Sequence, residues 1–171
     1  MNAYNFYINT LLEDIDYTQE FITGTYGLTN MVFVILSIFL IHAHGRKTLL
    51  FWGFLGMGCF QMLVAISLYQ KMVYLTFFSV LGFVSCMAIS TGPITWLYMA
   101  EVMDDKGLSV GTFILQSFTL LISAVTLPIK SWLGPEDVGA IFIFYGIHNF
   151  WAVIFTYIFV EETRGKTSAE I

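Results

Sequence analysis

Few side chains that could do chemistry lie in the long apolar stretches of this sequence. Cys59 and Cys86 both lie inside apolar runs, where thiols are more typical of small buried hydrophobes than of a disulfide framework. His148 stands alone in another apolar run, which is more typical of a packed histidine than of a proton relay. The sequence contains no nucleophile–base pair, metal-ligand cluster or phosphate-binding loop, so it predicts neither an enzyme nor a bound cofactor.

A glycine–proline pair interrupts the apolar stretch AISTGPITWLYMAEV, in which Gly92 precedes Pro93. Proline removes a backbone donor and clashes with the preceding helical turn, so it normally ends or bends a helix. At membrane depth such a break is tolerated where it is buried or lines a watery cavity, as in the discontinuous helices of transporters. The alternative is a plain proline kink that improves helix packing.

The composition identifies the class of protein in which these residues must be placed. Hydrophobic residues make up 57% of the 171 residues and charged residues only 11%, against about 25% charged in soluble domains. The sequence therefore predicts an integral membrane protein in contact with membrane lipids. Twelve acidic and seven basic residues leave no basic patch for nucleic acid.

Five charge-free gaps divide the chain, at residues 21–45, 48–70, 72–100, 107–129 and 138–160. Each gap holds 23 to 29 residues, and a membrane-spanning helix needs about 20. We therefore expect one all-α membrane domain over residues 1–171 with five full transmembrane helices. The expected spans are 21–43, 49–69, 72–103 with a break near 92–93, 109–129 and 138–160, followed by a short tail at 161–171.

Basic residues predict the orientation of these spans. One side of the membrane receives Arg46, Lys47, Lys106, Arg164 and Lys166, and the other receives only Lys71 and Lys130. The first side is therefore expected to be the cytoplasm, or the matrix if the membrane is mitochondrial. Residues 1–12 are apolar but too short to span, so they predict half a helix that lies elsewhere, meets a partner, or belongs to a longer protein.

Four stretches together resemble the C-terminal half of the sugar-porter family of the major facilitator superfamily. They are MNAYNFY, GRKTLLFWG, TGPITWLYMAEV and VEETRGKTSAEI. The resemblance extends from the middle of the family's seventh helix to just after its twelfth. It implies half of a major-facilitator helical bundle that would need an N-terminal half for alternating access.

The resemblance also implies a sugar site. Asn2, Asn30 and Trp96 match sugar-contacting positions, and the Gly92–Pro93 break is expected to face the central cavity. A sugar requires amides that donate and accept hydrogen bonds, together with a flat apolar wall. The alternatives are an interhelical hydrogen bond for Asn30 and core packing for Trp96.

Several positions depart from the family pattern. The family's acid before Gly-Pro is Ala88 here, and the proline after it is Thr95. An expected Asn-Trp pair on the eleventh helix is replaced by Thr119 and Leu120.

A charge network on the basic side is implied as well, through Arg46, Lys47, Glu101, Glu162 and Arg164. In the family such residues connect the end of the eighth helix, the end of the tenth helix and the C-terminal motif, and such a network can lock one conformation. The alternative is a set of solvated end charges that anchor the spans.

Two functions follow from these features. The first is the C-terminal half of a hexose or small-polyol transporter in a plasma membrane, with an N-terminal half as its partner. The second is a non-transporting structural subunit of a larger complex, such as a respiratory assembly of the mitochondrial inner membrane.

Overall fold

The computed structural model describes residues 19–133 and 138–165 of the chain. Asn2, the half helix expected at 1–12, and residues 166–171 lie outside the described residues. The described part contains helices and no strands, in the order α2 (Gln19–His44), α3 (Arg46–Tyr69), α4 (Val73–Ile89), α5 (Thr91–Val102), α6 (Asp105–Leu133) and α7 (Val138–Phe159). Five stretches are long and apolar enough to cross a membrane, with α4 and α5 together forming the third. The predicted all-α membrane bundle is confirmed.

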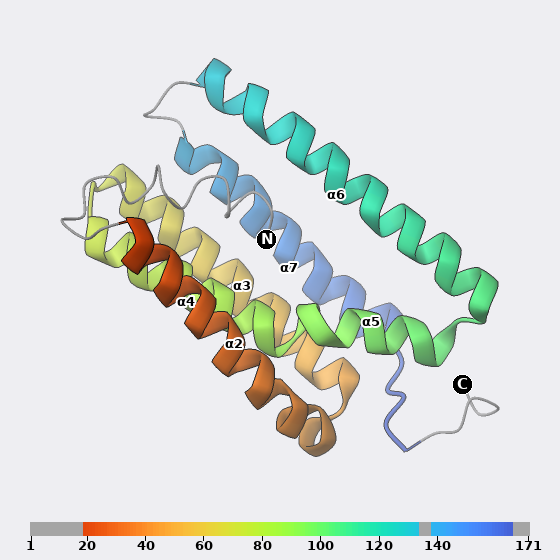
Figure 1. Cartoon of the computed structure of the whole chain (residues 1–171). Helices are drawn as coiled ribbons and strands as arrows, with labels where there is room; N and C mark the ends of the chain where they lie inside the picture. The colour runs from red at the N-terminus through yellow and green to blue at the C-terminus, as the bar shows by residue number, and fades with distance from the viewer. Residues whose placement is uncertain (1–18, 134–137, 166–171) are drawn as a thin grey trace.

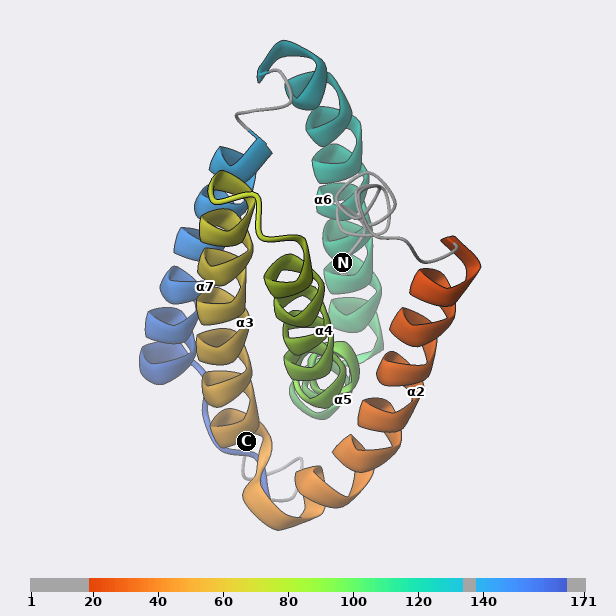
Figure 2. The same ribbon diagram turned by 90° about the vertical axis from the view of Figure 1, so that its left-hand side faces the viewer.

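The helix α3 is the centre of the bundle. It packs along α7 on one side and α4 on the other, and α2 lies against α4 (Figures 1 and 2). The main core is apolar and joins α2, α3, α4 and α7 through Ile22, Met57, Val64, Ala65, Val80, Phe83, Val84, Val138 and Phe142. Small residues bring these helices close together, as they commonly do in membranes: Gly58 lies against Phe150, and Gly146 against Met62.

The third span breaks at Ser90, which separates α4 from α5 and has φ −113° and ψ −85°. The break lies two residues before Gly92, because a proline ring clashes with the carbonyl four residues earlier, here that of Ile89. Pro93 itself lies in the first turn of α5, where a missing N–H is tolerated. Figure 2 shows α5 end-on while α4 runs lengthwise, so the span turns sharply at this point.

Ser90 is fully buried, and two contacts hold it. Its hydroxyl donates to the Cys86 carbonyl oxygen at 2.7 Å, which satisfies a backbone group near the end of α4. Gly53 on α3 lies directly against the Ser90 side chain, because a β-carbon at Gly53 would overlap it. The break is therefore packed into the bundle on its α3 side.

Polar pairs are also buried between the helices. Asn149 Nδ2 on α7 donates to Gln61 Oε1 on α3 at 2.5 Å, and Gln61 is only 4% exposed. The hydroxyls of Ser67 and Thr76 lie 2.8 Å apart between α3 and α4. Such bonds stabilise membrane bundles because lipid offers no alternative partner.

The helix α6 lies at the edge of the described bundle and contacts α5 near their shared turn (Figure 1). None of the residues in its membrane-length window is buried. Its exposed apolar side chains include Phe113, Phe118 and Leu120, which are 73%, 61% and 72% exposed. In a membrane protein these surfaces are available to lipid or to further helices.

Candidate functional site

A cluster of charged residues joins the ends of four helical elements on the basic side of the bundle. We call it the basic-side cluster, and it consists of Arg46, Lys47, Glu101, Glu162, Thr163 and Arg164. Arg46 opens α3, and Glu101 lies in the last turn of α5. Lys47 follows Arg46 in α3, and Glu162, Thr163 and Arg164 lie in the segment after α7.

The ion pair between Arg46 and Glu101 lies at the centre of this cluster. Arg46 Nη2 lies 2.6 Å from Glu101 Oε1, and Arg46 Nε donates to the same oxygen at 3.2 Å. The two side chains are only 19% and 23% exposed, so this pair is screened less than one in open water. It connects the start of α3 to the end of α5.

Glu162 has a different role, because it binds backbone N–H groups at the start of α3. Its Oε1 accepts from the Arg46 N–H at 2.8 Å, and its Oε2 accepts from the Lys47 N–H at 3.2 Å. The first N–H groups of a helix lack internal partners, and the helix dipole favours a negative charge there. This capping explains why α3 begins at Arg46 rather than at residue 49, where the sequence suggested the span begins.

Thr163 and Arg164 complete the cluster. The Thr163 hydroxyl donates to Glu101 Oε2 at 2.5 Å, and Thr163 is 3% exposed. Arg164 Nη1 donates to the Ala43 carbonyl oxygen in the last turn of α2 at 2.6 Å, where the helix dipole favours a positive charge. Sequence reasoning missed Thr163, although its place between Glu162 and Arg164 was the available signal.

Lys47 contributes its backbone to the cluster, and its side chain points elsewhere. Its Nζ donates to the Tyr157 carbonyl oxygen near the end of α7 at 2.9 Å and lies 5.7 Å from the centre of the Tyr157 ring. The ammonium group therefore stabilises the end of α7. All five residues suggested for the charge network lie in one region of the structure. Arg46 and Glu101 form an ion pair, whereas the side chains of Glu162, Lys47 and Arg164 bind backbone groups at helix ends.

The described residues suggested for sugar binding lie on α2 and α5. Asn30 is partly exposed on α2, and Gly92 and Pro93 lie in the first turn of α5. Trp96, one turn further along α5, is 44% exposed. None of these four residues lines the pocket at the turn between α5 and α6 or the pocket between α3, α5 and α7.

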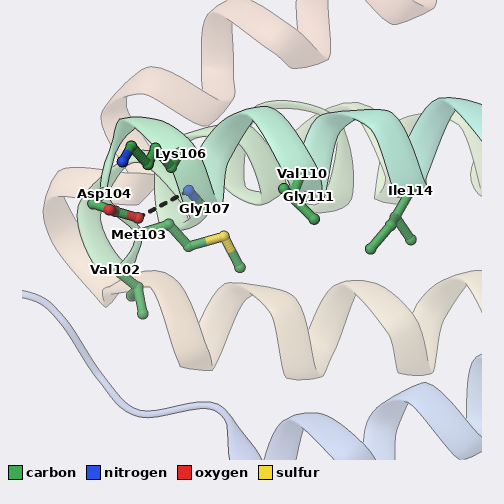
Figure 3. Close-up of a pocket in the computed structure, with 8 residues that line it drawn as sticks. All are labelled: Val102, Met103, Asp104, Lys106, Gly107, Val110, Gly111 and Ile114. Carbon is green, nitrogen blue, oxygen red and sulfur yellow. Dashed lines mark hydrogen bonds between the residues drawn. The ribbon is translucent and has the colours of Figure 1, made fainter.

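One of these pockets lies at the turn between α5 and α6 and has a volume of about 590 Å³. Figure 3 shows its lining, which is mostly apolar and includes Met103 and Ile114. Asp104 Oδ1, in this lining, accepts from the Gly107 N–H at 2.8 Å, so this acid caps the start of α6. The charged residues in its lining are one acid, Asp104, and one base, Lys106, so the pocket has no marked charge preference.

Comparisons with known proteins agree along the whole chain. The family model described as sugar (and other) transporter matches residues 1–171. Facilitated glucose transporter member 4 of solute carrier family 2 is 29% identical in Bos taurus and in Homo sapiens, and sugar transporter ERD6-like 6 of Arabidopsis thaliana is also 29% identical. Each match covers 100% of this chain but only 35–38% of the relative.

Solved structures give the same result. The proton:xylose symporter XylE bound to 6-bromo-6-deoxy-D-glucose matches with a TM-score of 0.87 and 26% identity, over 99% of this chain and 38% of that one. The inward-open conformation of XylE from E. coli matches with a TM-score of 0.66 over 85% of this chain and 33% of that one. The chain thus spans about a third of the length of these relatives. These relatives are transporters and not enzymes, as the sequence predicted. The predicted resemblance is confirmed: the chain belongs to the sugar transporter family, with the fold of the major facilitator superfamily.

Proposed function

We propose that this chain forms the C-terminal half of a transporter for a hexose or a similar small polyol. The observation that supports this most directly is the basic-side cluster, in which Arg46 and Glu101 pair at 2.6 Å. The cluster fastens α5 to α3 and to the segment after α7, at the end of the span that carries the Gly92–Pro93 break. A movement of α5 at the break would have to open these contacts.

The cluster would therefore favour one conformation of the bundle over another. A ligand or a contact shifts such an equilibrium only by the free energy that differs between the two states. Hydrogen bonds to charged groups contribute about 1.5–3 kcal/mol each when shielded from water. Losing one such bond would change the equilibrium constant between the conformation with the cluster intact and the conformation with the cluster open by roughly 10- to 150-fold.

The sugar would bind between Asn30 on α2 and Trp96 on α5, with Asn2 and the Gly92–Pro93 break at its edge. The Asn30 amide would donate to and accept from sugar hydroxyls, and the Trp96 ring would cover the apolar C–H face. One half supplies only one wall of such a site, so alternating access requires an N-terminal half. The membrane would be the plasma membrane.

Uptake of radiolabelled D-glucose into proteoliposomes tests this proposal. We expect no saturable uptake from the purified 171-residue chain alone, and uptake of D-glucose but not L-glucose when an N-terminal half is present. Asn30→Ala should lower the affinity for D-glucose about 5- to 100-fold. The reason is that loss of a hydrogen bond between an amide and its ligand in a buried site costs about 1–3 kcal/mol. Stereospecific flux from the chain alone would contradict the need for a second half.

A structural subunit without transport is the second candidate, and departures from the family pattern favour it. Ala88 and Thr119 carry smaller groups than the acid and the amide expected at these positions. This candidate predicts a partner in a larger complex, for example in the mitochondrial inner membrane. Purification from the native membrane in mild detergent separates the two: an N-terminal half in stoichiometric amount supports transport, and a set of unrelated subunits supports a structural role.

A further inference from the structure

His148 lies at the middle of α7 and on the exposed side of that helix. It follows Val138 by ten residues and precedes Phe159 by eleven, so each end of α7 is about 15–17 Å away along the axis. The packed environment that the sequence suggested for this histidine is not provided by the described helices. Polar side chains at this depth usually face the interior of a bundle and pair there, so an outward-facing histidine requires an explanation.

The His148 imidazole has one ring nitrogen that is bonded and one that is not. Its Nδ1 lies 3.2 Å from the Phe144 carbonyl oxygen, which can only accept, so an uncharged ring carries its N–H hydrogen on Nδ1. Nε2 is then an acceptor, and no described residue donates to it. The Phe144 ring packs against the imidazole, with 4.5 Å between the ring centroids. Hydrocarbon offers Nε2 no donor, so this nitrogen requires one from outside the described bundle.

Trp151 supplies the complementary group on the same helix face. It follows His148 by three residues, which makes the two neighbours on the helix surface, and it is 67% exposed. Its indole Nε1 can only donate, and no described residue accepts from it. Tryptophan in membrane proteins usually places this N–H in the interfacial belt, but Trp151 lies only about 4.5 Å along the helix from His148. One face of α7 therefore presents a free acceptor and a free donor near the middle of the membrane.

These two residues belong to an exposed seam along α7, which we call the α7 seam. Its members are spaced alternately four and three residues apart and are Phe144, His148, Trp151, Phe155 and Ile158. All five are exposed, and the apolar members Phe144, Phe155 and Ile158 are 57%, 58% and 62% exposed. An average spacing of 3.5 residues is the pattern with which two helices pack along a common seam. The pattern therefore favours a second helix along this face.

The α7 seam faces away from the rest of the described bundle. The helix α7 packs along α3, where Gly146 lies against Met62, and His148 is two residues after Gly146 and so about 160° around the helix. Figure 2 shows α7 and α2 at opposite edges of the bundle, with α3 and α4 between them. An N-terminal half that completed a site beside Asn30 on α2 would leave the α7 seam uncovered.

We propose that the α7 seam binds the α7 seam of a second copy of this chain, with His148 Nε2 of each copy accepting from the Trp151 indole N–H of the other. Two copies that cross the membrane in the same direction are related by a two-fold axis along the membrane normal, so equivalent residues lie at equal depth. The acceptor of each copy then faces the donor of the other, and both free groups are satisfied. The association goes beyond the proposed function and does not depend on it.

The pairing of donor and acceptor favours a second copy over a different protein. The α7 seam is self-complementary, because it carries one group of each kind three residues apart. A different protein would need its own donor and acceptor at the matching spacing. The axial offset of about 4.5 Å between His148 and Trp151 is small enough for two ring side chains to bridge, and the flanking Phe144 and Phe155 rings add apolar contact on either side.

Cysteine cross-linking tests which face associates. In a chain with Cys59→Ala and Cys86→Ala, a single cysteine replaces Phe155 in the α7 seam or Phe39 on α2, and membranes that contain the full chain are treated with copper phenanthroline. The two positions are matched, because they are 58% and 69% exposed and lie four and five residues before the ends of their helices. We expect Phe155→Cys to form a disulfide-linked dimer at least about tenfold faster than Phe39→Cys, because the bound second copy holds the two thiols together.

An association constant tests the two hydrogen bonds. It is measured by energy transfer between donor-labelled and acceptor-labelled chains in phosphatidylcholine vesicles at a series of protein-to-lipid ratios. His148→Leu and Trp151→Phe should each lower the association constant about 10- to 100-fold, because either change removes both symmetry-related hydrogen bonds. The double variant should lose little more than either single variant, since the two groups bond to each other. His148→Gln, whose amide oxygen can accept, should restore part of the association.

His42→Leu is the matched control for the histidine. His42 is also exposed and makes the same kind of bond, from Nδ1 to the Ile38 carbonyl oxygen at 2.7 Å, but it lies near the end of α2. We expect it to leave the association constant unchanged. A loss in His42→Leu equal to that in His148→Leu, or additive losses in the double variant, would contradict the bond between His148 and Trp151.

The cross-linking result can also overturn the proposal. Equal rates for Phe155→Cys and Phe39→Cys, or no dimer at either position, would mean that α7 is not the contact between copies. A disulfide adduct of Phe155→Cys with another membrane protein, in place of the dimer, would assign the α7 seam to a different partner. Neither result would bear on sugar transport, which the uptake assay tests separately.

Discussion

Replacing Glu101 by glutamine removes the negative charge at the centre of the basic-side cluster and leaves the shape of the side chain nearly unchanged. In the intact chain Glu101 Oε1 accepts two hydrogen bonds from Arg46, at 2.6 and 3.2 Å, and Oε2 accepts one from Thr163 at 2.5 Å. A glutamine cannot reproduce this set. One of its two terminal atoms becomes a donor, which then faces either the Arg46 guanidinium or the Thr163 hydroxyl.

The expected loss follows from burial. Exposed ion pairs contribute about 0.2–1 kcal/mol, whereas shielded hydrogen bonds to charged groups contribute about 1.5–3 kcal/mol. The side chains of Arg46 and Glu101 are 19% and 23% exposed. Their pair is therefore neither fully exposed nor fully shielded from water. We therefore expect Glu101→Gln to lower the free energy of unfolding by about 2 kcal/mol.

Unfolding of the purified chain in mixed detergent micelles, followed by helical circular dichroism, measures this loss. A double-mutant cycle with Arg46→Gln should give a coupling free energy of about 1–2 kcal/mol, because the two residues contact each other directly. Glu20→Gln on the opposite side of the bundle is the control and should change stability by less than about 1 kcal/mol. A coupling below about 0.3 kcal/mol would mean that the charges are solvated anchors rather than a joined cluster.

Three further substitutions test the packing. Tyr26→Phe should stabilise the chain by about 1 kcal/mol, because the Tyr26 hydroxyl is buried and bonds to none of the described residues; Tyr74→Phe, at a 68% exposed ring, should change nothing measurable by thermal unfolding. Gly53→Ala should destabilise by about 1–3 kcal/mol through overlap with the serine at the helix break, whereas Gly24→Ala, with nothing within 4 Å, should stabilise by up to about 1 kcal/mol. Pro93→Ala should increase helicity in circular dichroism and lower any sugar affinity; unchanged affinity would remove the break from the binding site.

The spans could be predicted because the cost of placing a charge in a bilayer is large compared with any local preference. Apart from the break at Ser90, each helix boundary therefore falls close to a charged residue, and five charge-free gaps correspond to the five long apolar stretches of the structure. The position of the break was harder to predict. A proline acts on the carbonyl four residues earlier, so Pro93 marks the cause of the break and Ser90 its location.

The partners of the polar groups could not be predicted from the sequence, because they depend on how the helices pack. The amides of Gln61 and Asn149 lie 88 positions apart in the chain, and only the contact between α3 and α7 pairs them. Their occurrence inside charge-free spans was the available signal, since a polar side chain at membrane depth requires a partner. Lys47 is a comparable case, because its charge is directed to the end of α7 by packing rather than by a nearby acid.

Gly45 shows how two distant motifs depend on each other. Its φ of 82° lies in the region that favours glycine, and a β-carbon built on it would lie 2.5 Å from Glu162 Oε2. Both the backbone turn before Arg46 and the seat for the Glu162 carboxylate therefore require glycine at this position. The GRK stretch after α2 and the EETRG stretch after α7 are thus halves of one structure: the first exposes the N–H groups of α3, and the second brings the carboxylate that binds them. This explains why neither motif can be interpreted alone, and why it was the resemblance to the sugar-porter family that implied their meeting.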